Sequence, residues 1–436
     1  MSQKTLRILL VALLFSFQAF SAEHVKNVIL MIGDGMGLAQ ISLAHYVKGQ
    51  KLNMESVSDT GLATNYCLDS FVTDSAAAGT ALATGEKTNS GMISTRPDRT
   101  RITTILERFM EKGAKTGLVT TTNITDATPA SFASHVPNRS SEEAIALQLV
   151  NSGVDVLMGG GSDFFLPVSK KGRRKDGLEL FQLAAQKGYS VVRTPAEMNI
   201  ASGRMLGIFG SSQLDFELNR QDQPNLAAMT GKALNLLSGS DKGFFLMVEG
   251  GRIDHAAHDN DPVGAVSELL MFDRAVGIAL DFARINGDTL VLITADHETG
   301  GLVLSNGDYK IVPEVLKKPI RTAEFLENAL APDCRNAGKV FRTYAGIDLT
   351  GAEIALLKNC SQKKNDPSLL KKKGDPGRIA FVTKILNERA KLGWVTYSHS
   401  ACMVAVMADG PCSEMFTGYM DNTDIPKRIA KAAALK

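Results

Sequence analysis

Short apolar runs of strand length alternate with longer amphipathic segments along most of this 436-residue chain. The runs are Val25–Ile32, Thr116–Thr121, Val154–Met158, Gly243–Val248 and Thr289–Thr294, and the segments between them include Thr103–Lys112, Ser141–Asn151 and Pro262–Ile285. Strands that are apolar on both faces are typical of a parallel sheet covered by helices on both sides. The pattern predicts an α/β fold, a three-layer α/β/α sandwich around a central, mostly parallel sheet.

The region 306–392 interrupts this alternation with lysine-rich stretches and loop signals such as Lys371-Lys372-Lys373-Gly374-Asp375-Pro376. We expect it to be a partly helical insertion that borders either the functional site or a subunit interface. The core domain is then formed by 23–305 and 393–436. A strand over Ala401–Met407 and a helix over Pro426–Leu435 are expected to close that domain.

Residues 1–22 have the order of a secretory signal peptide. Basic Lys4 and Arg7 precede the apolar run Ile8–Phe17, which is too short to span a bilayer, and small residues such as Ser21 follow. A buried N-terminal strand is the alternative, but this order of charge, apolar run and small residues favours export. We expect a periplasmic or secreted protein with no membrane segment after processing.

The formal net charge of +2 shows no bias towards nucleic acid, so we expect no nucleic acid as a specific partner. Five cysteines are few for a disulfide scaffold, and no Cys-x-x-Cys pattern occurs. Cys67 falls in an expected strand, Leu62–Leu68, and is interpreted as a small buried apolar residue. Cys334 and Cys360 lie in one polar segment and are the best candidate pair in an exported chain.

Metal-ligand residue types follow three of the predicted strands. Asp34 follows the first run, Glu249 follows the fourth, and Asp296 and His297 follow the fifth. In open parallel sheets, ligands bind outside the carboxyl ends of the strands. Each residue alone is typical of a turn or a helix N-cap. Together they put three carboxylates and an imidazole on one rim. The like-charged carboxylates would repel each other without a cation, so the sequence predicts a metal site.

Asp254 and His258 follow Glu249 closely and are spaced i and i+4, which places both side chains on one helix face. An imidazole and a carboxylate oxygen are suitable ligands for zinc. An exposed helical Asp–His pair would be the ordinary interpretation. The short distance in sequence from the strand-end Glu249 favours a metal site instead.

Ser75 is the candidate nucleophile. Thr73-Asp74-Ser75 is followed by an alanine-rich, helix-favouring stretch, so Ser75 is expected at a helix N-terminus, where backbone N–H groups favour a phosphate. A simple N-cap serine is the alternative. The sequence has no Gly-x-Ser-x-Gly elbow at Ser75 and no histidine close by, so activation by a metal ion is the natural route.

Taken together, six motifs in order make the chain resemble the alkaline phosphatase family, over nearly its whole length outside the insertion. They are Gly33-Asp34-Gly35-Met36-Gly37, Thr73-Asp74-Ser75-Ala76-Ala77, Thr125-Asp126-Ala127-Thr128-Pro129, His135-Val136-Pro137-Asn138-Arg139, Val248-Glu249-Gly250-Gly251-Arg252-Ile253-Asp254-His255, and Ala295-Asp296-His297-Glu298-Thr299-Gly300-Gly301. The resemblance implies an alkaline phosphatase that hydrolyses phosphate monoesters through a phosphoseryl intermediate on Ser75. It also implies a homodimer.

The resemblance further implies two zinc ions and one magnesium ion per chain. The first zinc site would use Asp254, His258 and His399. The second would use Asp34, Asp296 and His297, completed by the Ser75 hydroxyl oxygen. The magnesium site would use Asp34, Thr128 and Glu249, in keeping with the preference of magnesium for oxygen.

The resemblance assigns Arg139 as a clamp for two phosphate oxygens. Asp74, Asp126 and His255 would support the metals and the phosphate from around them. Family members commonly pair Asp with Lys, or use two His, at the positions of Asp126 and His255. This chain combines Asp126 with His255, and that mixed pair leaves the identity of the third metal open.

Two other functions compete with this interpretation. The first is a phosphodiesterase or sulfatase of the same superfamily, but the Cys/Ser-x-Pro-x-Arg context of sulfatases is absent, and diesterases usually carry Thr as the nucleophile. The second is an exported binding protein for anions or metals. The complete catalytic set of residues favours the phosphatase.

Overall fold

The computed structural model describes residues 25–307, 309–363 and 377–435, and for 359–363 the backbone alone. Its centre is a ten-stranded sheet in the order β14-β2-β13-β8-β1-β7-β3-β4-β6-β5. The strands are β1 (Asn27–Ile32), β2 (Asp59–Thr64), β3 (Lys115–Asn123), β4 (Val156–Gly160), β5 (Ser190–Val192), β6 (Met205–Ile208), β7 (Phe244–Glu249), β8 (Thr289–Thr294), β13 (Val404–Asp409) and β14 (Gly418–Asp421). The sheet is parallel except at β13, which runs antiparallel to both β8 and β2. The prediction of a mostly parallel sheet is confirmed.

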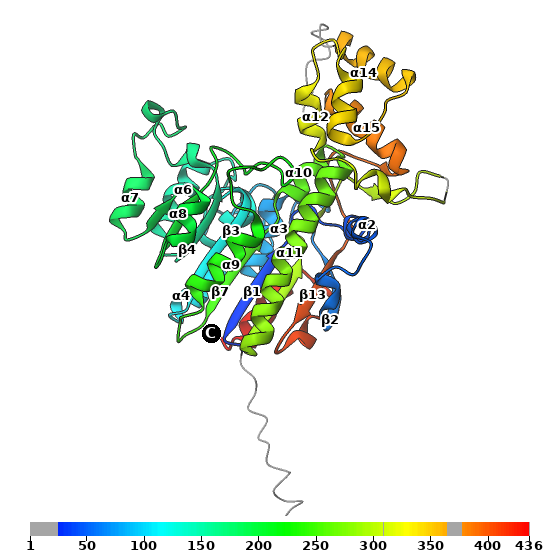
Figure 1. The fold of residues 1–436 in the computed structure, drawn as a ribbon. Coiled ribbons are helices and arrows are strands. Elements are labelled where there is room, and N and C mark those ends of the chain that lie inside the picture. Colours follow the sequence, from blue (N-terminus) through cyan, green and yellow to red (C-terminus); the bar gives the residue numbers. More distant parts are fainter. Residues whose placement is uncertain (1–24, 308, 364–376, 436) are drawn as a thin grey trace, which may run out of the picture.

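Helices cover both faces of this sheet (Figure 1). One face carries α2 (Leu38–Lys48), α9 (Leu226–Leu237) and α11 (Pro262–Asn286). The other carries α3 (Ser75–Thr84), α4 (Ile105–Glu111), α5 (Ala127–Ala133), α6 (Glu142–Asn151) and α16 (Asp424–Ala432). Two shorter helices, α7 (Leu180–Gln186) and α8 (Pro195–Ile200), lie beside the β5–β6 edge. The three-layer α/β/α architecture follows from these two helical layers.

Strand β7 shows how the apolar runs build the core. Successive side chains of a strand point to opposite faces, so adjacent phenylalanines serve different layers. Phe245 lies 5.4 Å from Phe109 of α4 and 6.0 Å from Phe132 of α5, measured between ring centroids. Phe244 lies 5.7 Å from Phe282 of α11 on the opposite face. All six residues of β7 are buried, which explains why its sequence is apolar without alternation.

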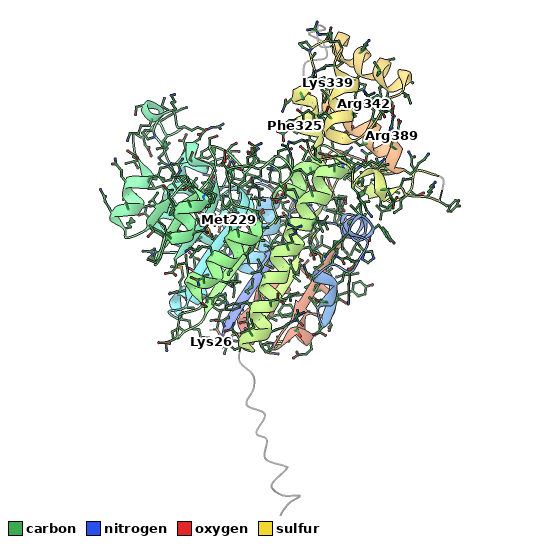
Figure 2. The ribbon with its side chains drawn as sticks, in the orientation of Figure 1. Lys26, Met229, Phe325, Lys339, Arg342 and Arg389 are labelled. Atoms are coloured by element: carbon green, nitrogen blue, oxygen red, sulfur yellow. The ribbon has the colours of Figure 1, made fainter. Side chains whose placement is uncertain are left out.

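Within the described part of 306–392 the chain forms a helical lobe that projects from one end of the sheet (Figure 1). It contains α12 (Ala323–Ala329), α13 (Ala337–Val340), α14 (Gly351–Lys363) and α15 (Ile379–Ala390). Figure 2 shows the side chains of Phe325, Lys339, Arg342 and Arg389 within this lobe, and that of Met229 on α9. A separate apolar cluster, which includes Leu326, Phe341 and Val382, forms its interior. The predicted partly helical character of this region agrees with the structure.

Two short ribbons join the lobe to the sheet. Strand β10 (Leu302–Val303) pairs with β11 (Gly393–Trp394), and β9 (Glu298–Thr299) pairs with β12 (His399–Ser400). The indole of Trp394 occupies the space beside Gly300, where a Cβ would lie 2.5 Å from the ring. Gly300 also has φ of +90°, a conformation that favours glycine. These pairings carry His399 back across the molecule to the segment after β8.

Two predicted boundaries are wrong. The strand expected over Leu62–Leu68 ends at Thr64, and Cys67 lies in the following loop. Cys67 is still buried, with its thiol directed at the Asp69 carboxylate 3.2 Å away. The strand expected over Ala401–Met407 is β13, which begins at Val404 and ends at Asp409, and a further core strand, β14, follows it. The expected signal peptide and the Cys360 side chain of the expected disulfide lie outside the described residues.

None of the helices in the described part of the chain combines the length and the apolar character that crossing a bilayer requires.

Phe245→Ala should destabilise the protein by about 3–5 kcal/mol, because it leaves a cavity between β7, α4 and α5. The measurement is the midpoint of thermal unfolding of the metal-loaded protein. Ile285→Ala removes an apolar side chain that is 85% exposed and should leave the midpoint almost unchanged. Equal shifts for the two variants would contradict the packing described for β7.

Candidate active site

Four neighbouring parallel strands, β8, β1, β7 and β3, bring the candidate ligands to one edge of the sheet. Asp34 follows β1, Glu249 ends β7, and the pair Asp296 and His297 follows β8. These strands run in the same direction, so their carboxyl ends meet at the same rim. All four side chains are buried, with at most 7% of their surface exposed. The rim therefore holds three carboxylates away from bulk water.

Ser75 begins helix α3 at this rim. Asp74 is the N-cap residue, and its carboxylate accepts a hydrogen bond of 3.0 Å from the Ala77 amide. The Ser75 hydroxyl lies 3.1 Å from Nε2 of His297, and the Ser75 side chain is buried. The prediction that Ser75 begins a helix is confirmed. Its hydroxyl therefore faces the carboxylates at the positive end of a helix.

The first cluster consists of Asp34, Asp296 and His297. One potential ligand atom from each lies within 4.8 Å of the others. Nε2 of His297 is 3.5 Å from Oδ1 of Asp34 and 3.2 Å from Oδ2 of Asp296. These three residues are the set that the family resemblance implies for one zinc ion, and His297 brings the set to the Ser75 hydroxyl.

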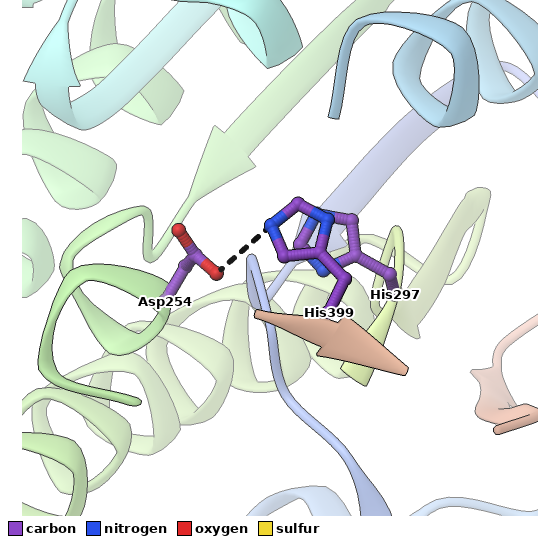
Figure 3. Close-up of side chains that lie close together, drawn as sticks. All are labelled: Asp254, His297 and His399. Atoms are coloured by element: carbon purple, nitrogen blue, oxygen red, sulfur yellow. Dashed lines mark ion pairs between the residues drawn. The ribbon is translucent and has the colours of Figure 1, made fainter. Parts of the chain in front are cut away.

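The second cluster consists of Asp254, His258 and His399. Helix α10 (Arg252–His258) places Nε2 of His258 3.3 Å from Oδ2 of Asp254, as the i, i+4 spacing predicts. His399 comes from β12, and its Nε2 lies 3.7 Å from Asp254 Oδ1 and 3.1 Å from His258 Nε2. Figure 3 shows the imidazoles of His399 and His297 stacked beside Asp254, with ring centroids 3.5 Å apart. The two clusters are therefore neighbours, with His297 between them.

Backbone carbonyls fix the proton on two of these imidazoles. Nδ1 of His258 lies 2.7 Å from the Tyr397 carbonyl oxygen, and Nδ1 of His399 lies 2.8 Å from the Thr73 carbonyl oxygen. A carbonyl oxygen only accepts, so each Nδ1 carries a proton and donates it. In the neutral form of each ring, Nε2 then presents a lone pair to the cluster. Two such lone pairs 3.1 Å apart repel each other unless a cation lies between them.

The buried oxygens give a second test of whether metal ions fit. Asp34 Oδ1, Asp296 Oδ2 and Thr128 Oγ1 are buried, and each lacks a hydrogen-bond partner among the described residues. Unpaired buried polar atoms are rare and costly. Here they share a site with imidazole lone pairs, which cannot donate to them. Nitrogen and carboxylate donors in this arrangement fit zinc, and an all-oxygen set fits magnesium.

The pKa values of the carboxyl groups show the same shortage of positive charge. Burial, followed by the charges of Asp296 and Asp254, raises the pKa of Asp34 well above its usual value. Burial and the charge of Asp254 raise the pKa of Asp296 to about 7. Asp254 is the exception. Burial opposes its ionisation, but attraction from His258, His297 and His399 holds its pKa below the usual range.

Glu249 lies at the other side of Asp34 in a small oxygen-rich site. It accepts hydrogen bonds from the hydroxyls of Thr120 and Thr122, both at the end of β3. Burial, with smaller contributions from the charges of Asp126 and Asp296, raises the pKa of Glu249 to about 8. The hydrogen bond from Thr120 opposes this rise. The unpaired hydroxyl of Thr128, on α5, is buried as well. Oxygen atoms are therefore the available ligands here.

Arg139 is held between two N-cap carboxylates. Its guanidinium donates to Asp74 at 3.1 Å and to Asp126 at 3.0 Å. Burial opposes its charge, but these two carboxylates raise the pKa of Arg139 above its already high value. The side chain keeps 33% of its surface exposed, so it remains open to a ligand. A fixed, exposed guanidinium is suited to bidentate binding of an oxyanion.

Three threonines that contact the site were missed by sequence reasoning. Thr299 donates to Asp254 at 2.5 Å and lies 3.2 Å from Nδ1 of His297, so it connects the two clusters. Thr120 and Thr122 orient Glu249. Thr299 lies inside one of the family motifs, Thr120 lies inside the predicted strand Thr116–Thr121, and Thr122 follows that strand, but nothing in their local sequence indicated these partners.

Arg252 is the other missed residue. It is 5% exposed and donates from Nη1 to Nδ1 of His255 at 2.8 Å. A guanidinium only donates, so Nδ1 of His255 accepts and this ring is neutral. Burial, together with the charge of Arg252, lowers the pKa of His255 to about 4. Neutral His255 accordingly lies beside Asp254 without adding positive charge.

The fold and the clustered carboxylates and imidazoles define a metal-dependent hydrolase built on a parallel sheet. Comparison with known proteins gives its family. The family model for alkaline phosphatase matches residues 25–435. Alkaline phosphatase 3 of Bacillus subtilis is 38% identical over 431 residues, covering 94% of this chain and 89% of the relative. Alkaline phosphatase of Escherichia coli is 34% identical, covering 64% of this chain and 71% of the relative.

Solved structures agree with this. The cold-active alkaline phosphatase of a psychrophilic Shewanella superposes with a TM-score of 0.84 at 31% identity, covering 93% of this chain and 99% of the other. The alkaline phosphatase of Thermus thermophilus gives a TM-score of 0.85 at 29% identity, covering 97% and 95%. The chain belongs to the alkaline phosphatase family and is a phosphoric monoester hydrolase.

Raised carboxyl pKa values make the metal-depleted protein less stable as the pH rises. The folded state keeps protons on Asp296 and Glu249 that the unfolded state releases from about pH 4 upward. The stability they contribute is complete below that pH and is lost as the pH passes about 7 for Asp296 and about 8 for Glu249. The unfolding midpoint should therefore fall between pH 5 and pH 9, and zinc should restore it.

Asp296→Asn keeps the hydrogen-bonding oxygen and removes the titration, so its midpoint should fall less over the same range. Asp281→Asn changes a carboxylate that is 75% exposed on α11 and should behave as the unmodified protein does. If the unfolding midpoint of Asp296→Asn fell as far as that of the unmodified protein, the raised pKa of Asp296 would not contribute to the pH dependence of stability.

Proposed function

We propose that this chain hydrolyses phosphate monoesters through a phosphoseryl intermediate on Ser75 at a site of two zinc ions and one magnesium ion. The observation that carries the proposal is the buried Ser75 hydroxyl, 3.1 Å from Nε2 of His297 and facing carboxylate oxygens that lack hydrogen-bond donors. His297 lies within hydrogen-bond distance of Ser75, but its Nε2 also faces Asp34 and Asp296. As a metal ligand, this nitrogen would not be free to accept the serine proton, so the serine needs a cation to stabilise its alkoxide. This geometry supports a metal-activated serine.

The residues that would hold each ion fall into three sets. Asp254, His258 and His399 would hold the first zinc ion. Asp34, Asp296, His297 and Ser75 would hold the second. Asp34, Thr128 and Glu249 would hold magnesium. A variant of the alkaline phosphatase from the Antarctic bacterium TAB5, which is 30% identical to this chain, has Mg bound in its M3 site. That relative supports magnesium for the oxygen-rich set.

The protein groups divide the reaction between them. Arg139 binds two phosphate oxygens and orients the phosphoryl group, while Asp74 and Asp126 hold the guanidinium in place. The Ser75 oxygen attacks phosphorus as the bond to the alcohol breaks, and water then attacks the phosphoserine and releases phosphate. The ions, when bound, lower the pKa of the serine hydroxyl and of water and stabilise the leaving oxygen. Carbonyl-bound Nδ1 atoms keep His258 and His399 in the tautomer that binds metal.

Other predictions remain part of this proposal. Residues 1–22 are proposed as a signal peptide, which places the protein in the periplasm or outside the cell. Residues 306–392 are proposed as an insertion in a catalytic domain formed by 23–305 and 393–436. We also propose a homodimer.

A relative from Streptomyces griseus, 37% identical over 62% of this chain, is a streptomycin-6-phosphate phosphatase, so relatives include enzymes for a particular alcohol.

A substrate comparison tests the reaction class. The purified protein should hydrolyse p-nitrophenyl phosphate well above bis-p-nitrophenyl phosphate and p-nitrophenyl sulfate. Chelation should abolish the activity, and zinc with magnesium should restore it, because every proposed group works through a metal ion. Elemental analysis should give two zinc ions and one magnesium ion per chain. Preference for the diester or the sulfate would contradict the monoesterase, and binding without turnover would indicate a binding protein.

Ser75→Ala should lower kcat for p-nitrophenyl phosphate by roughly a thousandfold or more, since it removes the nucleophile. Its metal content should stay near that of the unmodified protein, because Asp34, Asp296 and His297 remain. Acid quenching of the unmodified enzyme should trap phosphate on Ser75, as read by mass spectrometry. Ser140→Ala, an exposed serine next to Arg139, is the control. Activity within a few-fold of normal in Ser75→Ala would rule out the covalent route.

A further inference from the structure

A cavity of about 330 Å³ opens beside the second cluster. Helix α10 contributes Arg252, His255 and His258, and the loop before α9 contributes Phe216. Its outer wall is Glu324, from the first turn of α12 in the helical lobe. His258 belongs both to this wall and to the Asp254–His258–His399 cluster. The cavity therefore begins where the metal-ligand cluster ends.

The cavity is open to solvent, and contacts among its lining residues hold its wall. The guanidinium of Arg252 stacks 3.6 Å from the centre of the Phe216 ring and donates to His255 at 2.8 Å. Its other terminal nitrogen lies 3.5 Å from Glu324. A second cavity of about 310 Å³ shares Phe216, Arg252 and Glu324 and continues towards α12. Volumes of about 300–1,000 Å³ are usual for small-molecule sites.

Three contacts hold Glu324 in position. The Asp261 carboxylate accepts from the Ala323 amide at 2.9 Å, and Asn219 donates to the hydroxyl of Thr322 at 2.8 Å. Thr322 is in turn the N-cap of α12. The first turn of α12 is thus anchored to α11 and to the loop before α9. Glu324 itself keeps 47% of its side chain exposed, so its carboxylate is available to a ligand.

The charges on the wall are unequal. Glu324 and Asp259 are carboxylates, and both line the cavity. Arg252 is the one guanidinium among the lining residues, and His255 is neutral because its Nδ1 accepts from Arg252. Arg252 pairs with Glu324 and offsets one carboxylate. Burial, followed by the charges of Asp261 and Glu324, raises the pKa of Asp259 to about 7, so in alkaline solution the two carboxylates outnumber the one guanidinium. A cation in the cavity would be attracted there, and a second anion on the substrate would be repelled.

We propose that this cavity binds the alcohol part of the phosphate monoester and favours alcohols that carry an ammonium group over those that carry a carboxylate. The inference rests on the proposed phosphatase function. The cavity adjoins Asp254, His258 and His399, whose zinc ion would stabilise the leaving oxygen of the alcohol. Glu324 is the specificity residue. It acts on the ground state and the transition state alike, so the preference is expressed mainly in KM.

The test compares kcat/KM for three monoesters that differ in the charge of the alcohol: O-phosphoethanolamine, glycerol 3-phosphate and 3-phosphoglycerate. The unmodified enzyme should prefer them in that order. Glu324→Gln should lower kcat/KM for O-phosphoethanolamine by about threefold, as expected for a half-exposed ion pair. Glu324→Lys should reverse the order of the first and third substrates. Turnover of p-nitrophenyl phosphate, whose alcohol is uncharged, should stay near normal in both variants.

Glu111→Gln and Glu111→Lys make the same charge changes at an exposed residue of α4 and should leave the substrate order unchanged. Normal p-nitrophenyl phosphate turnover with an unchanged order in the Glu324 variants would overturn the subsite alone. A shift of equal size in the Glu111 variants would also overturn it, since net charge would then be the cause. Failure of the unmodified, metal-loaded enzyme to hydrolyse any monoester would overturn the phosphatase proposal together with the subsite.

Discussion

The convergence of hydrogen-bond acceptors at one rim of the sheet governs the rest of this structure. Carboxylates of Asp34 and Asp296 and the lone pairs of neutral imidazoles face one another with too few donors between them. Burial makes this arrangement costly, because each unpaired polar atom has lost its water. The divalent cations proposed for this site would supply the missing positive charge. The fold must hold these acceptors together for that site to exist.

The buried central strands of the sheet stabilise the fold against the mutual repulsion of these acceptors. Strands β8, β1 and β7 are apolar on both faces, and the phenylalanines of β7 are packed against helices in both layers. Thr299 donates a hydrogen bond to Asp254, and Nδ1 of His258 and of His399 each donates to a backbone carbonyl, which fixes these three side chains in one orientation. The rigid sheet sets where the carboxylates lie, and these bonds set which atoms they present.

The helical lobe contributes in a different way. It has its own apolar interior and adds no residue to the metal-ligand clusters described above. Its first helix is nevertheless held against the core by Asp261 and Asn219, so Glu324 reaches a cavity next to His258. The proposed chemistry and the proposed preference for the alcohol would thus reside on separate parts of one chain.

The sequence by itself determined the α/β class, the parallel core strands and the start of α3 at Ser75, because burial on both faces and helix capping leave local patterns. It also indicated the Asp254–His258 pair, since both lie on one short helix. Only the tertiary structure decided how His399 joins that pair, because β12 returns from beyond the lobe and pairs with β9. Thr299, Thr120 and Arg252 were likewise invisible in sequence. Their partners lie on other strands or helices, and a contact between distant segments leaves no periodic signal in either segment.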